Sequence, residues 1–451
     1  MSSDSPAGHT VVFDVGKTNK KTLVFDSAFE VVEERSVELP RAEDEDGHPC
    51  DDLSLLDEWL REEKRRVLMH PEFQVVAMNA SGYGASFVHL GAGGEPVLPL
   101  YDYLKPLPAA IEQSFLETYG PKEHIAVRTA SPWMGMLNSG LQLYWLGTAH
   151  SDRFTEVSAS LHLPQYLAYR LGHPPADELT SLGCHTMLWD FESMNYAGWV
   201  HAEGIASRFP RRVPTASHVD VDGVRVGPGV HDSSAALVPY LRAFGHEPFV
   251  LLSTGTWSIA LNPFSTDPLT PAELAQDVLC YLSPEGQPVK AARLFLGNEH
   301  AHQTERLAAH FERASDTYKT VTFDEHWAEP APQWPDFAPS TLDGFTAADS
   351  DPWPLDTFTS YEEAYHALVH GLVTRQLAAY ELSRGSTPVR RLFVDGGFAR
   401  NAIFMALLSR RLPNLSVAAA DLPQATALGA GLLVSSAPTD LLNRRFNKSP
   451  I

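Results

Sequence analysis

One aspartate opens a segment with helical spacing. Asp232 lies in Gly-Val-His-Asp-Ser-Ser-Ala-Ala (residues 229–236), and apolar residues recur at helical intervals after it. An isolated aspartate in this position commonly caps the helix. The same carboxylate can also serve as a general base toward a hydroxyl, with the helix N-terminus holding anionic charge nearby. Both roles remain open from this stretch alone.

A second aspartate ends the first apolar run of the chain. Asp14 begins Asp-Val-Gly-Lys-Thr-Asn-Lys-Lys (residues 14–21), in which a glycine and small polar residues can bring backbone N–H groups to a phosphate. A carboxylate there can hold a hydrated magnesium ion, because Mg²⁺ usually keeps several waters. The segment contains no GxxxxGK[ST] pattern, so it is not a P-loop. The alternative is an ordinary hairpin turn.

Two further turns have residues suited to a nucleotide. The segment 253–258 (STGTWS) concentrates hydroxyl groups around one glycine. The segment 394–401 (VDGGFARN) has a double glycine between an expected strand and an expected helix, which permits close approach of the backbone to a ligand. Each turn taken alone is also explained as a simple connection, so the order of the four segments is more informative than any one of them.

The elements around these turns indicate an α/β fold. Two strand–turn–strand units are expected, with strands at 11–15 and 21–26 and at 249–253 and 257–261. Further strands are expected at 74–79, 391–395 and 415–419. Helical spacing is found at 53–70, 131–146, 162–171, 233–244, 361–380, 400–412 and 426–434. The alternation of strands and helices is typical of the α/β class. We expect two domains, residues 1–228 and 229–451.

Composition narrows the class of protein. The chain has 451 residues and a formal net charge of −22, which argues against binding to a nucleic-acid backbone. Its three cysteines have no metal-binding spacing and suit a reducing cytoplasm. Neither a secretory signal nor an apolar run of about 18 residues is found, so we expect no membrane association. The acidic segment 41–52 is expected to be a solvated loop, and 326–358 an irregular surface excursion.

The order of these segments closely resembles that of the FGGY carbohydrate kinases, which share a superfamily with actin and hexokinase. The resemblance rests on VVFDVGKTNKKTLVFD, GVHDSSAAL, LLSTGTWS, FVDGGFARN and ATALGAGLL. The TGTWS and His-Asp-Ser forms are most similar to the rhamnulokinase and fuculokinase branches. The resemblance implies two ribonuclease-H-like domains, with ATP and a sugar meeting in the cleft between them.

The resemblance also implies roles for individual residues, with Asp232 as the catalytic base. The first phosphate motif comprises Asp14, Gly16, Thr18, Asn19 and Lys20. The second phosphate motif contains Gly255 and Thr256, and the adenosine motif contains Gly396, Gly397 and Asn401. The sugar is expected to contact Gly82, His231, Asp232 and Asn298. Mg²⁺ is expected to bind Asp14 through water, with Asp232 as a further candidate. Residues 425–429 match a helix near the interdomain hinge.

Some features depart from the family pattern. Lys17 replaces a small or hydroxyl residue, and the Phe-Gly-Gly-Tyr run is absent. Tyr83, Tyr101, Asp102 and Trp133 either line the sugar pocket or are ordinary packing residues. The predicted function is ATP-dependent phosphorylation of a small ketose such as L-rhamnulose or L-fuculose, by a chain that could form homo-oligomers. The alternative is a catalytically silent or chaperone-like ATP-binding member of the superfamily.

Overall fold

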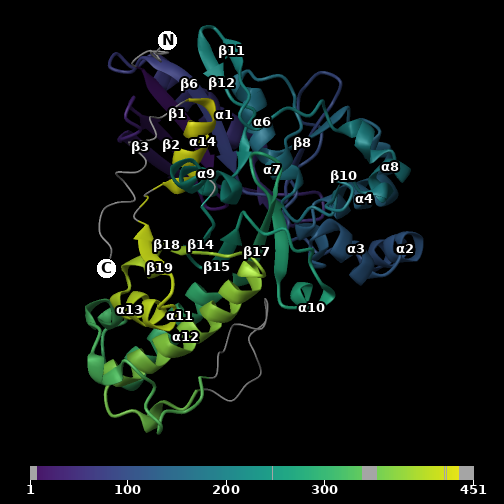
Figure 1. Cartoon of the computed structure of the whole chain (residues 1–451). Helices are drawn as coiled ribbons and strands as arrows, with labels where there is room; N and C mark the ends of the chain where they lie inside the picture. Colours follow the sequence, from purple (N-terminus) through teal and green to yellow (C-terminus); the bar gives the residue numbers. More distant parts are fainter. Residues whose placement is uncertain (1–7, 246, 338–352, 421, 423, 436–451) are drawn as a thin grey trace.

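Two large β-sheets form the frame of the molecule. The computed structural model describes residues 8–245, 247–337, 353–420, 422 and 424–435. Figure 1 shows the two sheets one above the other, with helices α9 (Asp232–Phe244) and α14 (Ala425–Val434) between them. Among the described residues, no helix is both long and apolar enough to cross a bilayer.

The first sheet has strand order β11-β12-β6-β1-β2-β3, and β13 also pairs with β6. Its strands are β1 (His9–Val15), β2 (Asn19–Phe25), β3 (Val31–Glu38), β6 (Val75–Gly82), β11 (Val219–Val221), β12 (Val224–Val226) and β13 (Val230–His231). Strands β1 and β6 are parallel, and their continuous apolar runs match strands covered on both faces. The last strand of this sheet along the chain is β13, just after residue 228. The predicted domain boundary at residue 228 stays a prediction.

The second sheet has strand order β16-β17-β15-β14-β18-β19. Its strands are β14 (Phe249–Thr254), β15 (Ser258–Asn262), β16 (Val278–Leu282), β17 (Pro288–Leu294), β18 (Arg391–Gly396) and β19 (Ser416–Ala420). As in the first sheet, the first strand of an antiparallel hairpin (β14–β15) has a parallel partner later in the chain, here β18, which in turn pairs in parallel with β19. Both predicted strand–turn–strand units are therefore present, and each begins one of the two sheets.

Helices and short ribbons complete the fold. The remaining α-helices are α1 (Leu53–Leu68), α2 (Ala109–Tyr119), α3 (Lys122–Thr129), α4 (Gly140–Ala149), α5 (Ser151–Phe154), α6 (Leu163–Leu171), α7 (Leu179–Leu182), α8 (Gly198–Ala202), α10 (Pro271–Leu274), α11 (Leu296–His310), α12 (Tyr361–Arg384) and α13 (Ala402–Arg411). The 3₁₀ turns are Gly135–Leu137, Ile205–Arg208, Thr317–Thr320, Glu325–Trp327, Leu355–Thr357 and Phe398–Arg400. The two-stranded ribbons are β4 (Arg41–Glu43) with β5 (Pro49–Asp51), β7 (Phe87–Leu90) with β8 (Ala159–His162), and β9 (Trp189–Asp190) with β10 (Asn195–Tyr196).

Helix α14 packs closely on α9 because its residues are small. A Cβ atom at Gly429 would lie 1.8 Å from the carbonyl oxygen of Ala235, so only glycine fits there. Pro239, inside α9, has no N–H to donate to that oxygen. One buried cluster extends from Val12 of β1 through α9 and α14 to Leu251 of β14, and it joins the two sheets through the helices between them.

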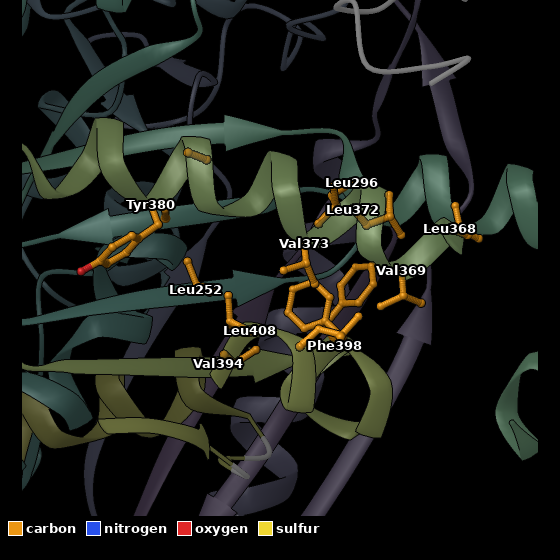
Figure 2. Close-up of a cluster of buried hydrophobic side chains, with 14 of the residues drawn as sticks. Leu252, Leu296, Leu368, Val369, Leu372, Val373, Tyr380, Val394, Phe398 and Leu408 are labelled. Atoms are coloured by element: carbon orange, nitrogen blue, oxygen red, sulfur yellow. The ribbon is translucent and has the colours of Figure 1, made fainter. Parts of the chain in front are cut away.

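Helix α12 packs against the second sheet and helix α13. Its apolar face, including Leu368, Leu372 and Val373, is buried against neighbours such as Leu252 and Phe398 (Figure 2). Full burial of one such side chain contributes about 1.5–3 kcal/mol. This core also positions functional residues, because Phe398 follows the double-glycine turn.

Two expectations differ from the structure, and a third is covered by it only in part. The segment 41–52 is not a solvated loop but contains the β4–β5 hairpin, in which Asp44 and Asp51 are buried. Their partners are distant lysines, and Lys105 Nζ lies 2.6 Å from Asp44 Oδ2. The helix expected at 131–146 begins only at Gly140, after a 3₁₀ turn. Of the excursion 326–358, positions 338–352 lie outside the described residues.

Candidate active site

Three parallel strands of the first sheet end side by side at predicted site residues. Asp14 of β1 lies opposite Ser81 of β6, and Gly82 of β6 lies opposite His231 of β13. Asp232 follows directly as the first residue of α9. Ligands of open α/β sheets bind outside the carboxyl ends of the strands, which is where these residues lie.

Asp14 is a buried carboxylate with a high pKa. Burial raises its pKa to about 6, against an ordinary value of 3.8. The Ser81 hydroxyl donates a 2.6 Å hydrogen bond to Oδ1 and lowers this pKa, whereas the negative charge of Asp232 raises it further. The effect of Asp232 on Asp14 indicates that the two carboxylates lie near each other. A cation there would relieve their repulsion.

The two oxygens of Asp232 differ in their surroundings. Oδ1 accepts hydrogen bonds from the backbone N–H of Ser233 at 2.5 Å and from Ser233 Oγ at 3.2 Å. It also lies 3.1 Å from His231 Nε2. Oδ2 accepts no hydrogen bond from any residue that the structure describes, and the side chain is 34% exposed. Oδ2 is therefore open to a ligand hydroxyl.

His231 is largely enclosed by protein. Its side chain is 4% exposed, and Nε2 lies 3.0 Å from Cys184 Sγ within hydrogen-bonding geometry. Burial lowers the pKa of His231 and raises that of the Cys184 thiol well above its usual range, so both groups are neutral near pH 7. The contact of His231 with a sugar stays a prediction.

The first predicted phosphate turn is compact. Gly16 N–H donates to the carbonyl of Asn19 at 2.9 Å, and Thr18 and Asn19 are exposed at the tip. Lys20, also predicted for this motif, has a buried side chain, and its Nζ lies 3.1 Å from Asp51 Oδ1. Alternation along β2 instead places Lys21 opposite Asp14 in the β1–β2 register.

Lys17 connects the first turn to the β4–β5 hairpin. Its Nζ lies 3.2 Å from Asp51 Oδ2 and 3.1 Å from Asp102 Oδ2. The same ammonium lies over the rings of Tyr83 and Tyr103. The charge of Asp232 contributes to the raised pKa of Tyr103, after burial and Asp102, so this cluster lies near Asp232.

Two of the four aromatic or acidic pocket candidates are packing residues. Tyr101 is buried, and its ring packs edge-on against Trp145 at 5.0 Å. Trp133 packs near Phe115 at 6.0 Å. Tyr83 and Asp102 belong to the Lys17 cluster described above.

The parallel strands of the second sheet end at the other predicted motifs. Thr254 of β14 lies opposite Gly396 of β18. Gly396 has φ +87°, and a Cβ atom there would lie 1.9 Å from the carbonyl oxygen of Thr254, so glycine is required. Gly397 N–H donates to that same oxygen at 2.8 Å, which fixes the double-glycine turn against the Thr254–Gly255 turn.

A cavity of about 680 Å³ lies between these turns and α11. Predicted residues from both motifs line it, namely Gly255, Thr256, Gly397 and Asn401. Its wall also includes side chains that the sequence analysis did not single out for a site, namely His300, Tyr318, Tyr365, Phe398 and Arg400. Asn298 lies beside this region, because its backbone N–H donates to the carbonyl of Thr256 at 3.2 Å.

A second cavity of about 460 Å³ adjoins the first, and Arg400 lines both. Gly396 and Gln424 also line it, together with Ala236, one helical turn after Asp232 on α9. Lys21 Nζ donates to Gln424 Oε1 at 3.2 Å, which connects the first hairpin to this wall. The two cavities thus extend from Asn401 to Ala236 of α9 and Gln424.

Comparison with protein families identifies the second half of the chain. Residues 246–442 match the family described as "Carbohydrate kinase FGGY, C-terminal domain". This part of the chain is similar to the C-terminal domains of the FGGY carbohydrate kinases. The predicted enzyme class, a phosphotransferase acting on an alcohol group, is the class of these FGGY carbohydrate kinases and is confirmed.

Solved structures of kinases share the fold over nearly the whole chain. A carbohydrate kinase from Novosphingobium aromaticivorans is 25% identical, with a TM-score of 0.76 and 98% of each chain covered. A ligand-bound xylulose kinase from Lactobacillus acidophilus is 16% identical, with a TM-score of 0.77 and coverage of 96% of this chain and 91% of that one. A Plasmodium falciparum glycerol kinase with ADP is 14% identical, with a TM-score of 0.71 and coverage of 99% and 93%. A comparison with curated protein sequences finds no significant match.

These similarities confirm the predicted two-domain, actin-like α/β architecture of the FGGY kinases. No sequence motif indicated Ser81, His300, Tyr318 or Tyr365 as site residues. Ser81 lies in a stretch of small residues beside Gly82. A polar residue at the end of a predicted strand could have indicated a site residue here. Tyr365 lies in the segment of helical spacing at 361–380, and no local pattern distinguishes it from its packing neighbours.

Proposed function

We propose that the chain transfers the γ-phosphoryl group of ATP to a hydroxyl of a small sugar, with Asp232 as the general base. The observation that supports this most directly is the free Oδ2 of Asp232 at the start of α9. A general base must lie within hydrogen-bond reach of the proton that it accepts, and Oδ2 is the oxygen open to such a contact. If Asp232 were only an ordinary helix cap, it would not need a second carboxylate, Asp14, nearby. It would also not need a cavity that reaches Ala236 on the same helix.

The nucleoside of ATP would occupy the larger cavity. Gly255, Thr256, Gly397 and Asn401 line this space, as expected of the second phosphate motif and the adenosine motif. Arg400 lines both cavities, and its guanidinium suits phosphate oxygens. The phosphates would then extend through the smaller cavity toward Asp14 and Asp232.

Mg²⁺ fits the donor set near Asp14. Within the described ranges, no group of three or more His, Cys, Asp or Glu side chains could hold a metal ion. Mg²⁺ is usually bound by one or two carboxylates plus waters and phosphate oxygens, so this absence is compatible with it. Asp14 would hold the ion through water, and Asp232 is a second candidate. When bound, Mg²⁺ would neutralise charge on the β- and γ-phosphates.

In the proposed reaction, Asp232 Oδ2 accepts the proton of the acceptor hydroxyl. The hydroxyl oxygen bonds to the γ-phosphorus as the bond to the ADP oxygen breaks. Positioning and electrostatic stabilisation supply most of the acceleration in phosphoryl transfer. The protein's own contribution is to hold the hydroxyl near Asp232 and the nucleotide along the ends of the second sheet.

For the sugar, we propose a ketose such as L-rhamnulose or L-fuculose. The support is the resemblance of TGTWS and His231-Asp232-Ser233 to the rhamnulokinase and fuculokinase branches. The hydroxyl-binding side would be formed by Gly82, His231 and the neighbouring cluster of Lys17 and Tyr103. Asn298 lies by the Thr256 turn. We therefore propose that it acts closer to the nucleotide than to the general base Asp232.

The test is a product assay with magnesium-ATP and a panel of acceptors. The panel contains L-rhamnulose, L-fuculose, L- and D-ribulose, L- and D-xylulose, D-fructose and glycerol, and the sugar phosphate is detected by ³¹P NMR. We expect phosphorylation of one ketose well above the others. ATP binding without phosphorylation of any acceptor would contradict the proposal and favour the silent or chaperone-like alternative.

A further inference from the structure

A chain of hydrogen bonds crosses the wall of the larger cavity. Asn401 Nδ2 donates to the Tyr365 hydroxyl at 2.8 Å, and that hydroxyl lies 3.0 Å from His300 Nε2. The three residues come from α13's N-cap, α12 and α11, so three helices position the chain. All three side chains line the cavity.

The direction of this chain follows from its first member. Asn401 Oδ1 accepts from the backbone N–H of Phe404 at 3.0 Å, which orients the amide and leaves Nδ2 to face Tyr365. An amide nitrogen only donates, so the Tyr365 oxygen is the acceptor. The hydroxyl proton of Tyr365 is then free to point at His300 Nε2.

The proton on His300 can therefore be placed. Burial lowers the pKa of His300 to about 4, so the ring is neutral near pH 7 and has a single N–H. If Nε2 carried that proton, the hydroxyl proton of buried Tyr365 would have no acceptor among the described residues. A buried donor without a partner costs about 1–3 kcal/mol. The arrangement that satisfies every group places the proton on Nδ1.

The free N–H of His300 is available to a ligand. No described residue accepts a hydrogen bond from Nδ1, and His300 lines the cavity. Aromatic rings surround it: Tyr318 lies edge-on at 5.0 Å and Phe398 at 5.4 Å. An aromatic wall with one outward donor suits a flat heterocycle that has an unprotonated ring nitrogen.

We propose that His300 is a specificity-determining residue for the nucleotide, and that its Nδ1–H donates to a ring nitrogen of the adenine. Tyr365 and Asn401 act as positioning residues, because they hold the imidazole in the tautomer that donates into the cavity. This inference rests on the proposed function only in taking ATP as the ligand. The His300 contact would recognise the adenine itself, which the backbone of the glycine motifs cannot do.

The test measures nucleotide binding by calorimetry, without a sugar. Wild type is compared with His300→Phe, which keeps an aromatic ring but removes the donor, and with Tyr365→Phe, which removes the relay. The matched control is His302→Phe, on the exposed side of the same helix. The probes are ATP and its 1-deaza, 3-deaza and 7-deaza analogues, each of which replaces one ring nitrogen with a C–H group.

We expect wild type to bind one deaza analogue about 10-fold more weakly than ATP, as expected for a lost hydrogen bond of about 1.4 kcal/mol. His300→Phe should bind ATP and that analogue equally. Tyr365→Phe should show an intermediate preference, and His302→Phe should behave as wild type. Equal binding of all four nucleotides by wild type, or unchanged discrimination in His300→Phe, would overturn the inference.

A second measurement tests the tautomer without any nucleotide. In ¹⁵N-histidine-labelled protein, the signals lost in His300→Phe identify His300. We expect shifts of a neutral ring protonated at Nδ1, and an Nε2–H ring would overturn the inference. Neither measurement depends on phosphoryl transfer. If wild type discriminates among the nucleotides but phosphorylates no sugar, the proposed function fails and this inference stands.

Discussion

The Ser81 hydroxyl donates a 2.6 Å hydrogen bond to Asp14 Oδ1, across the ends of the parallel strands β6 and β1. This bond orients a carboxylate whose pKa is raised to about 6 by burial and by the nearby charge of Asp232, although the bond itself lowers that pKa. The folded protein therefore holds Asp14 in an environment where its ionised form is unfavourable until a cation arrives.

Replacing Asp14 with asparagine should stabilise the protein when ATP and Mg²⁺ are absent. The folded pKa of about 6 exceeds the ordinary value of 3.8, so the contribution of Asp14 to stability is present below about pH 3.8 and is lost as the pH rises through 6. Asp14→Asn removes this loss. Urea unfolding should show a gain of about 1–3 kcal/mol at pH 7.5, since one pKa unit corresponds to about 1.4 kcal/mol.

The gain should shrink strongly at pH 4, where wild-type Asp14 is protonated in the folded state. An equal gain at both pH values would show that ionisation of Asp14 is not its cause. In the presence of magnesium-ATP and sugar, the same variant should lose activity, because it lacks the carboxylate proposed to hold the hydrated ion.

Gly396 and Gly397 should respond differently to alanine. At Gly396, with φ +87°, a Cβ atom would lie 1.9 Å from the Thr254 carbonyl oxygen. Gly396→Ala should therefore lower the free energy of unfolding by at least about 1–3 kcal/mol and weaken ATP binding. At Gly397, with φ −62°, a Cβ atom would lie 3.9 Å from that oxygen. Gly397→Ala is the matched control, and equal destabilisation by the two changes in urea unfolding would refute this explanation.

Asp51 should be essential to stability although it lies in an acidic surface hairpin. Its carboxylate lies 3.1 Å from Lys20 Nζ and 3.2 Å from Lys17 Nζ. Burial raises its pKa, but Lys17, the Tyr83 hydroxyl and Lys20 together hold that pKa below its usual value. Asp51→Ala leaves the buried Lys20 ammonium without this partner, which should cost about 3–5 kcal/mol in chemical denaturation.

The control for Asp51 is Asp46→Ala in the same hairpin. Asp46 is exposed and shares its partner Lys105 with Asp44, so its loss should leave the free energy of unfolding nearly unchanged. If Asp51→Ala were as mild as Asp46→Ala, the Lys17–Lys20 cluster would not be what holds the first turn in place.

Much of the fold was predictable because it depends on local patterns. Continuous apolar runs predicted β1, β14 and β18, and helical spacing predicted α9 and α12. The β4–β5 hairpin was not predictable in this way. Its aspartates resemble solvated charges until Lys17, Lys20 and Lys105 are brought against them, and those contacts join residues far apart in the chain.

The candidate site was predictable to a similar extent. Its turn residues were identified by type, and the structure gathers Asp14, Gly82, His231 and Asp232 at neighbouring strand ends. The roles assigned to them stay predictions. The wall formed by His300, Tyr318 and Tyr365 depends on how α11 and α12 pack beside Asn401, and helical spacing predicts that a face is buried without indicating what it faces.

Asp232 is proposed to be the base for transfer of the phosphoryl group to a sugar. The most direct measurement compares wild type and Asp232→Asn for transfer of ³²P from γ-labelled ATP to the preferred ketose, with ATP affinity determined in parallel. Asparagine keeps the size of the side chain but cannot accept the proton. We expect a fall in kcat of at least about 10²–10⁴-fold, with ATP affinity within a few-fold of wild type. Wild-type transfer by Asp232→Asn would contradict this role.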